Sequence, residues 1–179
     1  MPHIHTEPGQ HDHTASAFII RTDTPEPVIL FHMHKKLHKL LQPGGHVELN
    51  ETPWQAVPHE IQEETGYELS QLDILQPQLR LKSLSGVTIH PIPLNQNTHL
   101  FKDGIDHFHT DITYAFISHQ KPAGLPGEHE SNDLRWLTAV QLRALDTSEV
   151  GESSRDIALY ALENILDRWE VVRLGEFAA

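Results

Sequence analysis

Apolar and polar positions alternate in short runs over much of this chain, a spacing typical of β-strands with at least one buried face. Runs rich in β-branched and aromatic residues predict two strands, 15–21 and 28–34, which form a hairpin through the turn at 22–27. Residues 37–41 lead into a third strand, which ends at a turn formed by Pro43, Gly44 and Gly45. Three later segments predict further strands: 79–89, 98–102 and 109–118.

Signals for both ends of a helix frame residues 52–66. Thr52 can cap the N-terminus, Pro53 suits the first helical position, and Gln55 completes a capping-box pattern. Gly66 suits a left-handed cap at the C-terminus. Pro58 would remove one backbone hydrogen bond from such a helix. We therefore expect either a regular helix that begins after Thr52 or a kink at Pro58.

Two more helices are expected in the last third of the chain. Residues 137–145 predict a short helix, and residues 154–173 predict a long amphipathic helix with apolar side chains at helical spacing. This order of strands and helices predicts an α/β fold in which helices cover both faces of a mixed sheet. At 179 residues and 38% hydrophobic, the chain can bury one core. We therefore expect a single domain over residues 14–179.

Residues 1–13 are polar, and we expect them to form a flexible N-terminal segment; its histidines are His3, His5, His11 and His13. A formal net charge of −12 argues against binding to a nucleic-acid backbone. The absence of cysteine excludes disulfides, thiolate zinc sites and cysteine nucleophiles. No apolar run is long enough for a membrane span, and the start lacks a signal-peptide pattern, so we expect a cytoplasmic protein that does not bind membranes.

Three carboxylates, Glu60, Glu63 and Glu64, occupy positions that share one face of the predicted helix. Like charges packed in this way destabilise a helix unless a cation neutralises them, and Mg²⁺ prefers carboxylate oxygens. The glycine turn before the helix allows close approach of the backbone, so a carbonyl near Gly44 or Gly45 could be a further ligand. The alternative is a solvated acidic helix face without a metal ion.

The spacing of residues 45–67 fits a known pattern. Gly45 is followed after five residues by Glu51 and after seven more by the segment HEIQEETGY, which begins at His59. This arrangement resembles the Nudix box of the Nudix hydrolases, in which arginine stands at the position of His59. Every other defined position of the box matches. The resemblance covers most of residues 14–145 and includes the strand-like segment DLRWL before the predicted short helix.

The resemblance implies a Nudix-type α/β/α sandwich that hydrolyses a nucleoside diphosphate linked to another moiety, with Mg²⁺ or Mn²⁺ as the metal ion. By position, it makes Glu60 and Glu64 the principal metal ligands, and Glu63 an additional ligand or the catalytic base. Gly45 would lie beside the metal-binding turn. The expected catalytic residues are therefore Glu60 and Glu63.

Three other box residues are implied to be structural: Glu51, His59 and Gly66. Glu51 would pair with residue 59 and hold the loop on the helix. Because histidine is charged only near or below neutral pH and lacks the bidentate guanidinium of arginine, we expect His59 to make a weaker, pH-sensitive contact and to leave the metal site intact.

Two further groups of polar residues have both a functional and a structural interpretation. His107, His109 and Asp111 alternate on a predicted strand, so they could form a second metal site, contact substrate, or line the polar face of a half-buried strand. Glu128 and Glu130 lie in a loop rich in Gly and Pro, where either could be a catalytic carboxylate, a further ligand or simply exposed.

The sequence therefore predicts a metal-dependent hydrolase of a phosphoanhydride bond in a nucleotide-like small molecule, acting as a monomer or a homodimer. The alternative is a catalytically silent Nudix-fold module that binds a nucleotide or a sugar to regulate another process. The intact set of three glutamates favours the hydrolase.

Overall fold

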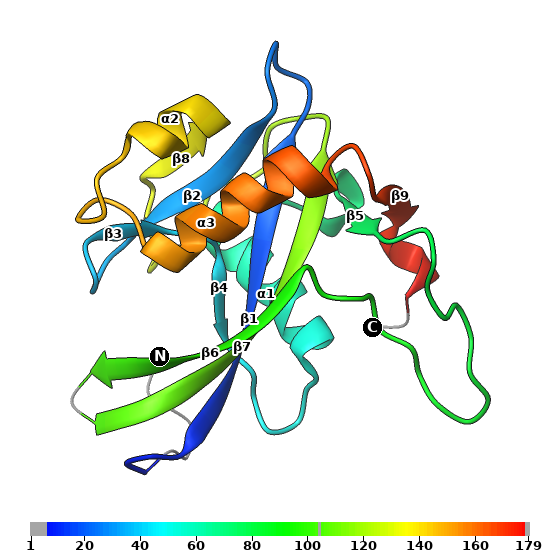
Figure 1. The fold of residues 1–179 in the computed structure, drawn as a ribbon, viewed down its shortest axis with the longest axis horizontal. Helices are drawn as coiled ribbons and strands as arrows, with labels where there is room; N and C mark the ends of the chain where they lie inside the picture. The colour runs from blue at the N-terminus through cyan, green and yellow to red at the C-terminus, as the bar shows by residue number, and fades with distance from the viewer. Residues whose placement is uncertain (1–6, 104, 178–179) are drawn as a thin grey trace.

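The computed structural model describes residues 7–103 and 105–177 and shows one mixed β-sheet with helices on both faces (Figure 1). Its strands are β1 (His11–Arg21), β2 (Val28–His34), β3 (Lys39–Leu41), β4 (Gly44–His46), β5 (Asp73–Gln76), β6 (Asn95–Asp103), β7 (Ile105–Ser118), β8 (Leu134–Leu137) and β9 (Glu170–Arg173). The helices are α1 (Pro53–Thr65), α2 (Ala139–Ala144) and α3 (Glu152–Tyr160), and α3 continues into a π-helical turn at Ala161–Ile165. Short 3-10 turns lie at Leu69–Gln71 and Leu174–Glu176.

The main path of the sheet runs in the order β3, β2, β1, β7, β5, β9. β4 pairs with β1, β6 with β7 and β8 with β2. At the centre, β1 and β7 are parallel, and their register places Asp12 opposite His109 and Thr14 opposite Asp111. This pairing brings polar side chains from distant parts of the chain to the same end of the sheet.

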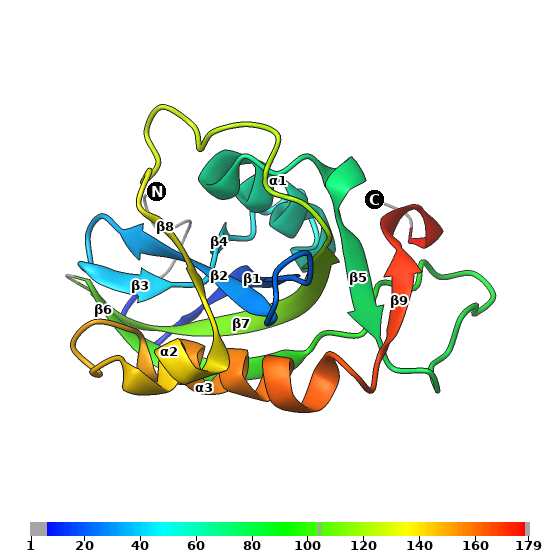
Figure 2. The ribbon, with the colours of Figure 1, turned by 90° about the horizontal axis from the view of Figure 1, so that it is seen from above.

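Side chains along β1 alternate between two hydrophobic cores, one on each face of the sheet. Ala17 packs in a cluster with Ile61 of α1. Phe18, the next residue, packs in a second cluster with Leu142 of α2 and Ala158 of α3. Figure 2 shows α1 on one side of the sheet and α2 and α3 on the other. The predicted α/β/α sandwich is confirmed.

The ends of α1 follow the predicted capping pattern. Thr52 accepts a hydrogen bond from the backbone N–H of Gln55 at 3.3 Å, and the Gln55 side chain accepts one from the N–H of Thr52 at 2.9 Å. Gly66 closes the helix with a φ of 72°. α1 begins at Pro53, directly after its cap Thr52, and it includes Pro58. Pro58 removes one backbone hydrogen bond, and burial of the apolar face of α1 offsets the free energy lost with it.

The strand predicted at residues 79–89 is wrong, because this segment forms a loop between β5 and β6. Its apolar side chains are exposed, with Leu79 at 94% and Leu81 at 70%. A strand needs a partner edge as well as β-forming residues. Here the edges of the neighbouring strand β5 are already paired with β7 and β9.

The predicted helix over 154–173 is correct for its first part and wrong for its last. Glu170–Arg173 forms β9, which pairs antiparallel with β5 and places Val172 opposite Ile74. Both side chains are buried in the core on the α1 side of the sheet. Pairing with a distant strand therefore overrides a local helical spacing.

The N-terminal boundary also differs from the prediction. β1 begins at His11, so His11 and His13 belong to a strand and not to a flexible segment, whereas His3 and His5 lie outside the described residues. β4 is a further strand, formed by the predicted glycine turn itself. None of the helices in residues 7–103 and 105–177 is long and apolar enough to cross a membrane.

Candidate active site

The site is built where α1 packs against the two glycines of β4. The backbone N–H of Gly44 donates a hydrogen bond of 2.8 Å to the Glu64 carboxylate. Gly45 lies so close to the Glu60 carboxylate that a Cβ at this position would collide with it. Both glutamates are buried, at 8% exposure. The glycine pair is therefore needed for the close approach of strand and helix.

Burial makes these two carboxylates hard to ionise. It is the main reason that the pKa of Glu60 is raised from 4.5 to about 7, and the carboxylates of Glu63 and Glu130 add to the effect. Burial also raises the pKa of Glu64 well above its ordinary value, although the hydrogen bond from Gly44 opposes the rise. Two acidic groups held in this way favour any cation that can neutralise them.

His32 of β2 lies on the other side of Glu64, with its Nε2 3.8 Å from Oε2. Burial lowers the pKa of His32 to about 4, and the nearby His34 adds to the effect. His32 is therefore a neutral imidazole near pH 7 and does not supply a positive charge to Glu64.

The third carboxylate of the predicted cluster does not share the burial of the other two. Glu63 is exposed, while Glu60 and Glu64 line a cavity of about 560 Å³. Glu130 lines this cavity as well, and Glu128 is exposed outside it. The structure thus brings Glu60, Glu64 and Glu130 together.

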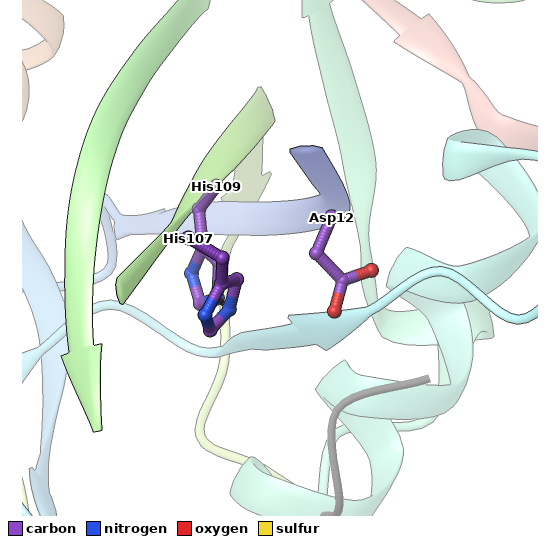
Figure 3. Close-up of side chains that lie close together, drawn as sticks. All are labelled: Asp12, His107 and His109. Carbon is purple, nitrogen blue, oxygen red and sulfur yellow. Dashed lines mark hydrogen bonds between the residues drawn. The ribbon is translucent and has the colours of Figure 1, made fainter. Parts of the chain in front are cut away.

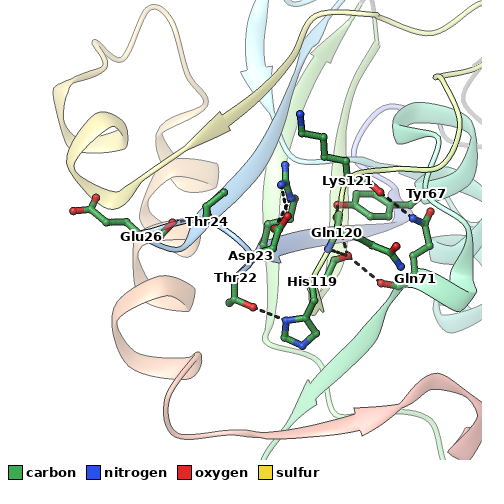
Figure 4. Close-up of polar contacts among 11 residues, drawn as sticks. Thr22, Asp23, Thr24, Glu26, Tyr67, Gln71, His119, Gln120 and Lys121 are labelled. Atoms are coloured by element: carbon green, nitrogen blue, oxygen red, sulfur yellow. Dashed lines mark hydrogen bonds and ion pairs between the residues drawn. The ribbon is translucent and has the colours of Figure 1, made fainter.

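The loop that carries Glu130 is attached to the C-terminal end of α1. The N–H of Gly127 donates to the Glu63 carbonyl at 2.7 Å, and the N–H of Gly124 donates to the Gly66 carbonyl at 2.9 Å. Nearer β7, the Tyr67 hydroxyl donates to the Gln120 carbonyl at 2.7 Å, and Figure 4 shows the surrounding polar contacts. These contacts fix the path of the loop toward the cavity.

The lysines at the rim of the cavity give it a positive side. Lys35 and Lys36 follow β2 and are exposed lining residues. Lys35 donates to the backbone carbonyl of His129 at 2.7 Å, which joins the rim to the loop of Glu130. The cavity therefore has acidic groups in its wall and basic groups at its edge, a combination suited to phosphate and a divalent cation.

Glu51 and His59 form the contact expected of the loop before α1. His59 Nδ1 lies 3.5 Å from Glu51 Oε2, and the His59 side chain is 69% exposed. The second oxygen of Glu51 accepts a hydrogen bond of 2.9 Å from the N–H of Glu48. Glu51 therefore links its own loop to the helix through a single, long and solvent-exposed contact with His59.

Of the alternating polar residues on β7, His107 and His109 lie together and Asp111 has a different role. The Nε2 atoms of the two histidines are 3.1 Å apart. Asp111 accepts hydrogen bonds from three hydroxyls, those of Thr14, Ser16 and Thr113, at 2.7–2.9 Å. The carboxylate that lies together with the two histidines is Asp12.

Asp12 and His46 were not predicted as site residues. Asp12 lies in the segment expected to be flexible, and His46 follows the glycine pair without matching a defined position of the box. Asp12 precedes the apolar run that begins at Ala15, and neither residue has a sequence signal beyond its polar character. Their position follows from the pairing of β1 with β7 and β4.

The residues present suit a hard divalent cation. The donors that could hold it are the buried carboxylates of Glu60 and Glu64 and the backbone at Gly45, all of them oxygen ligands of the kind that Mg²⁺ and Mn²⁺ prefer. The raised pKa values of the two glutamates give a physical reason for a cation at this point.

A model of the NUDIX domain matches residues 11–157, most of the chain. Among solved structures, a hydrolase of the NUDIX family from Clostridium perfringens is 29% identical, with 85% of this chain and 96% of that chain covered and a TM-score of 0.69. A search of curated proteins found no match.

More distant structures share the fold. The Ap4A hydrolase of C. elegans, solved as a binary complex, is 18% identical over 84% of this chain and 95% of its own, with a TM-score of 0.58. The NUDIX domain of Shewanella oneidensis NrtR, complexed with ADP ribose, is 13% identical over 88% of each chain, with a TM-score of 0.59.

Proposed function

The chain belongs to the Nudix family of hydrolases, enzymes that act on phosphorus-containing acid anhydrides, and from this we propose that it is a metal-dependent pyrophosphohydrolase of a nucleoside diphosphate derivative. The observation that carries the proposal is the pair of buried glutamates, Glu60 and Glu64, held against the glycines of β4 in the wall of a cavity. Family membership alone would not require this arrangement to be intact.

In this proposal, Glu60, Glu64 and the backbone of Gly45 hold Mg²⁺ or Mn²⁺. When bound, such an ion polarises a phosphate oxygen and offsets the charge of the leaving group. The chain's own contribution is to keep both carboxylates in place. The N–H of Gly44 fixes one oxygen of Glu64, and the missing side chain at Gly45 leaves room for Glu60.

Two residues are candidates for the base that accepts a proton from the attacking water. Glu63 is the residue that the family resemblance implies, but its side chain is exposed and does not line the cavity. Glu130 lines the cavity, and both Glu130 and Glu63 lie close enough to raise the pKa of Glu60 and Glu64. Position in the cavity therefore supports Glu130 as the base, with Glu63 as an additional ligand.

A nucleotide-like substrate agrees with the polarity of the cavity. Lys35 and Lys36 at the rim can bind phosphate oxygens, and the volume of about 560 Å³ is that of a small-molecule site. The net charge of −12 repels an anionic substrate. In this proposal, these lysines and the metal ion offset that repulsion at the site.

The direct test is product analysis with Mg²⁺ or Mn²⁺ and a panel of nucleoside triphosphates, dinucleoside polyphosphates and nucleotide sugars. We expect release of a phosphate-containing product from at least one class. Glu64→Gln should lower kcat by a factor on the order of 1,000, because one buried anionic ligand is lost while the shape of the side chain is kept. Glu26→Gln, the same change at an exposed site, is the matched control and should keep full activity.

Two outcomes would contradict the proposal. A fully active Glu64→Gln protein would remove Glu64 from the site, and no turnover of any panel member would favour the silent binding module. The same assay on Glu63→Gln and Glu130→Gln distinguishes the two candidate bases, since loss of the base should lower kcat by about 100-fold or more and change its pH profile.

A further inference from the structure

A second group of potential metal ligands is carried not by α1 but by the two parallel strands at the centre of the sheet. It consists of Asp12 from β1 and His107 and His109 from β7 (Figure 3). One donor atom from each residue lies within 4.8 Å of the other two. All three side chains are buried, with exposures of 8%, 1% and 7%.

The pairing of β1 with β7 creates this group. Asp12 lies directly opposite His109 in the parallel register, and His107 comes two residues earlier on the same strand. Residues two apart on a strand share a face, so both imidazoles lie on the side of the sheet to which the Asp12 carboxylate points. Figure 3 shows the two rings next to each other and the carboxylate on the same side.

Neighbouring side chains hold the orientation of these groups. His46 of β4 places its Nε2 3.3 Å from Asp12 Oδ2. The ring of Phe101, on β6, stacks on His109 with a centroid distance of 4.4 Å and an interplanar angle of 11°. In metal sites, a ligating carboxylate is typically in contact with a further polar side chain, and apolar groups pack around the ligands. His46 and Phe101 occupy such positions beside Asp12 and His109.

We propose that Asp12, His107 and His109 bind a divalent transition-metal ion such as Zn²⁺, at a site separate from the glutamates of α1. Two imidazole nitrogens and one carboxylate are ligands that favour Zn²⁺ over Mg²⁺, which prefers oxygen. In a tetrahedral zinc site with bonds of about 2.0–2.1 Å, two ligand atoms lie roughly 3.3 Å apart. The two Nε2 atoms form a hydrogen bond of 3.1 Å in the metal-free structure, a separation close to this value.

The site has three protein ligands and lies at the wall of the cavity already described. His109 and His46 line that cavity together with Glu60 and Glu64. Three protein ligands leave a fourth position for water or for an oxygen atom of a bound molecule. The ion would therefore connect β1 to β7 and also present a Lewis acid to the same cavity.

Metal-free full-length protein is titrated with Zn²⁺ in the presence of excess Mg²⁺, and bound zinc is measured by equilibrium dialysis and elemental analysis. We expect one zinc ion per chain in the wild type and in Glu64→Gln. His107→Gln and Asp12→Asn should each weaken zinc binding by at least about 100-fold. Loading with Co²⁺ should produce the visible absorption of a four-coordinate site in the wild type and not in these variants.

The matched controls address three other histidines of this chain, His3, His5 and His119. A His3→Ala/His5→Ala variant tests binding by the N-terminal segment, and His119→Asn tests an exposed histidine far from the cluster; both should keep full zinc affinity. Circular dichroism of each metal-free variant checks the fold, and Asp12→Asn preserves shape if His107→Gln fails to fold. Three results would each overturn the proposal. The wild type does not bind zinc, Asp12→Asn binds zinc as well as the wild type does, or only the His3→Ala/His5→Ala variant loses binding.

Discussion

His59 lies on the exposed side of α1, where its imidazole reaches Glu51 across 3.5 Å. The Nudix box has arginine at this position, and a guanidinium could form two parallel hydrogen bonds with the same carboxylate. A histidine loses its positive charge as the pH rises above neutral, whereas arginine keeps it. The contact between the loop and the helix is therefore expected to weaken at alkaline pH in this chain.

His59→Arg should consequently stabilise the protein more at pH 8 than at pH 6. We expect a gain of about 0.5–1 kcal/mol in the free energy of unfolding at pH 8, the range of an exposed ion pair, measured by urea denaturation. The double variant Glu51→Gln/His59→Arg is the control, because it keeps the arginine and removes its partner. An identical gain in the double variant, or no dependence of the gain on pH, would show that residue 59 does not act through Glu51.

At the scale of elements, the contact of α1 with β4 determines the geometry of the proposed metal site. Gly45→Ala places a methyl group where the Glu60 carboxylate lies, so either the carboxylate or the strand must move. A displacement of about 1 Å at a catalytic group can cost on the order of 100-fold in rate, and we expect a loss of this size in kcat. The measurement is steady-state hydrolysis together with the affinity for Mg²⁺, which should also fall.

Gly175→Ala is the matched control, since a Cβ there meets nothing within 4 Å. It should leave both activity and thermal stability unchanged. A Gly45→Ala protein with normal kcat and normal Mg²⁺ affinity would mean that the close approach of β4 to Glu60 has no part in the reaction.

Local sequence signals predicted the elements that form the glutamate site. The caps of α1, its three glutamates and the glycine pair depend on residues fewer than 25 apart, within the reach of turn and capping rules. The elements predicted wrongly depend on distant partners. Residues 79–89 have strand-like composition, but the neighbouring strand β5 is already paired on both edges. Glu170–Arg173 leaves a helical pattern to pair with β5.

The histidine cluster shows the same limit within the site itself. The alternation of His107 and His109 was visible in the sequence, and their placement on one face of a strand follows from it. The third member, Asp12, is 95 residues before His107 in the chain and joins it only through the parallel register. No local pattern specifies that register, because it depends on how the whole sheet is assembled.

Across the whole molecule, the ionisation of the buried glutamates links folding, pH and metal binding. The pKa of Glu60 in the folded protein is about 7, above its ordinary 4.5, so the metal-free folded state binds a proton more tightly than the unfolded state does. The proton on Glu60 therefore stabilises the folded state fully below pH 4.5, and this stabilisation is lost as the pH rises through about 7. At ~1.4 kcal/mol per pH unit, the loss amounts to about 3 kcal/mol.

The free energy of unfolding of metal-free protein should therefore fall between pH 5 and pH 8 more steeply in the wild type than in Glu60→Gln, where the titrating group is gone. Glu26→Gln, which removes an exposed carboxylate, should follow the wild type. Millimolar Mg²⁺ competes with the proton for the same oxygens, so it should raise the melting temperature of the wild type at pH 8 and have little effect at pH 5. Two results would contradict this prediction: parallel pH profiles for the wild type and Glu60→Gln, or an equal effect of Mg²⁺ at both pH values. Either would show that the folded protein does not hold the carboxylates near Gly45 as a cation site.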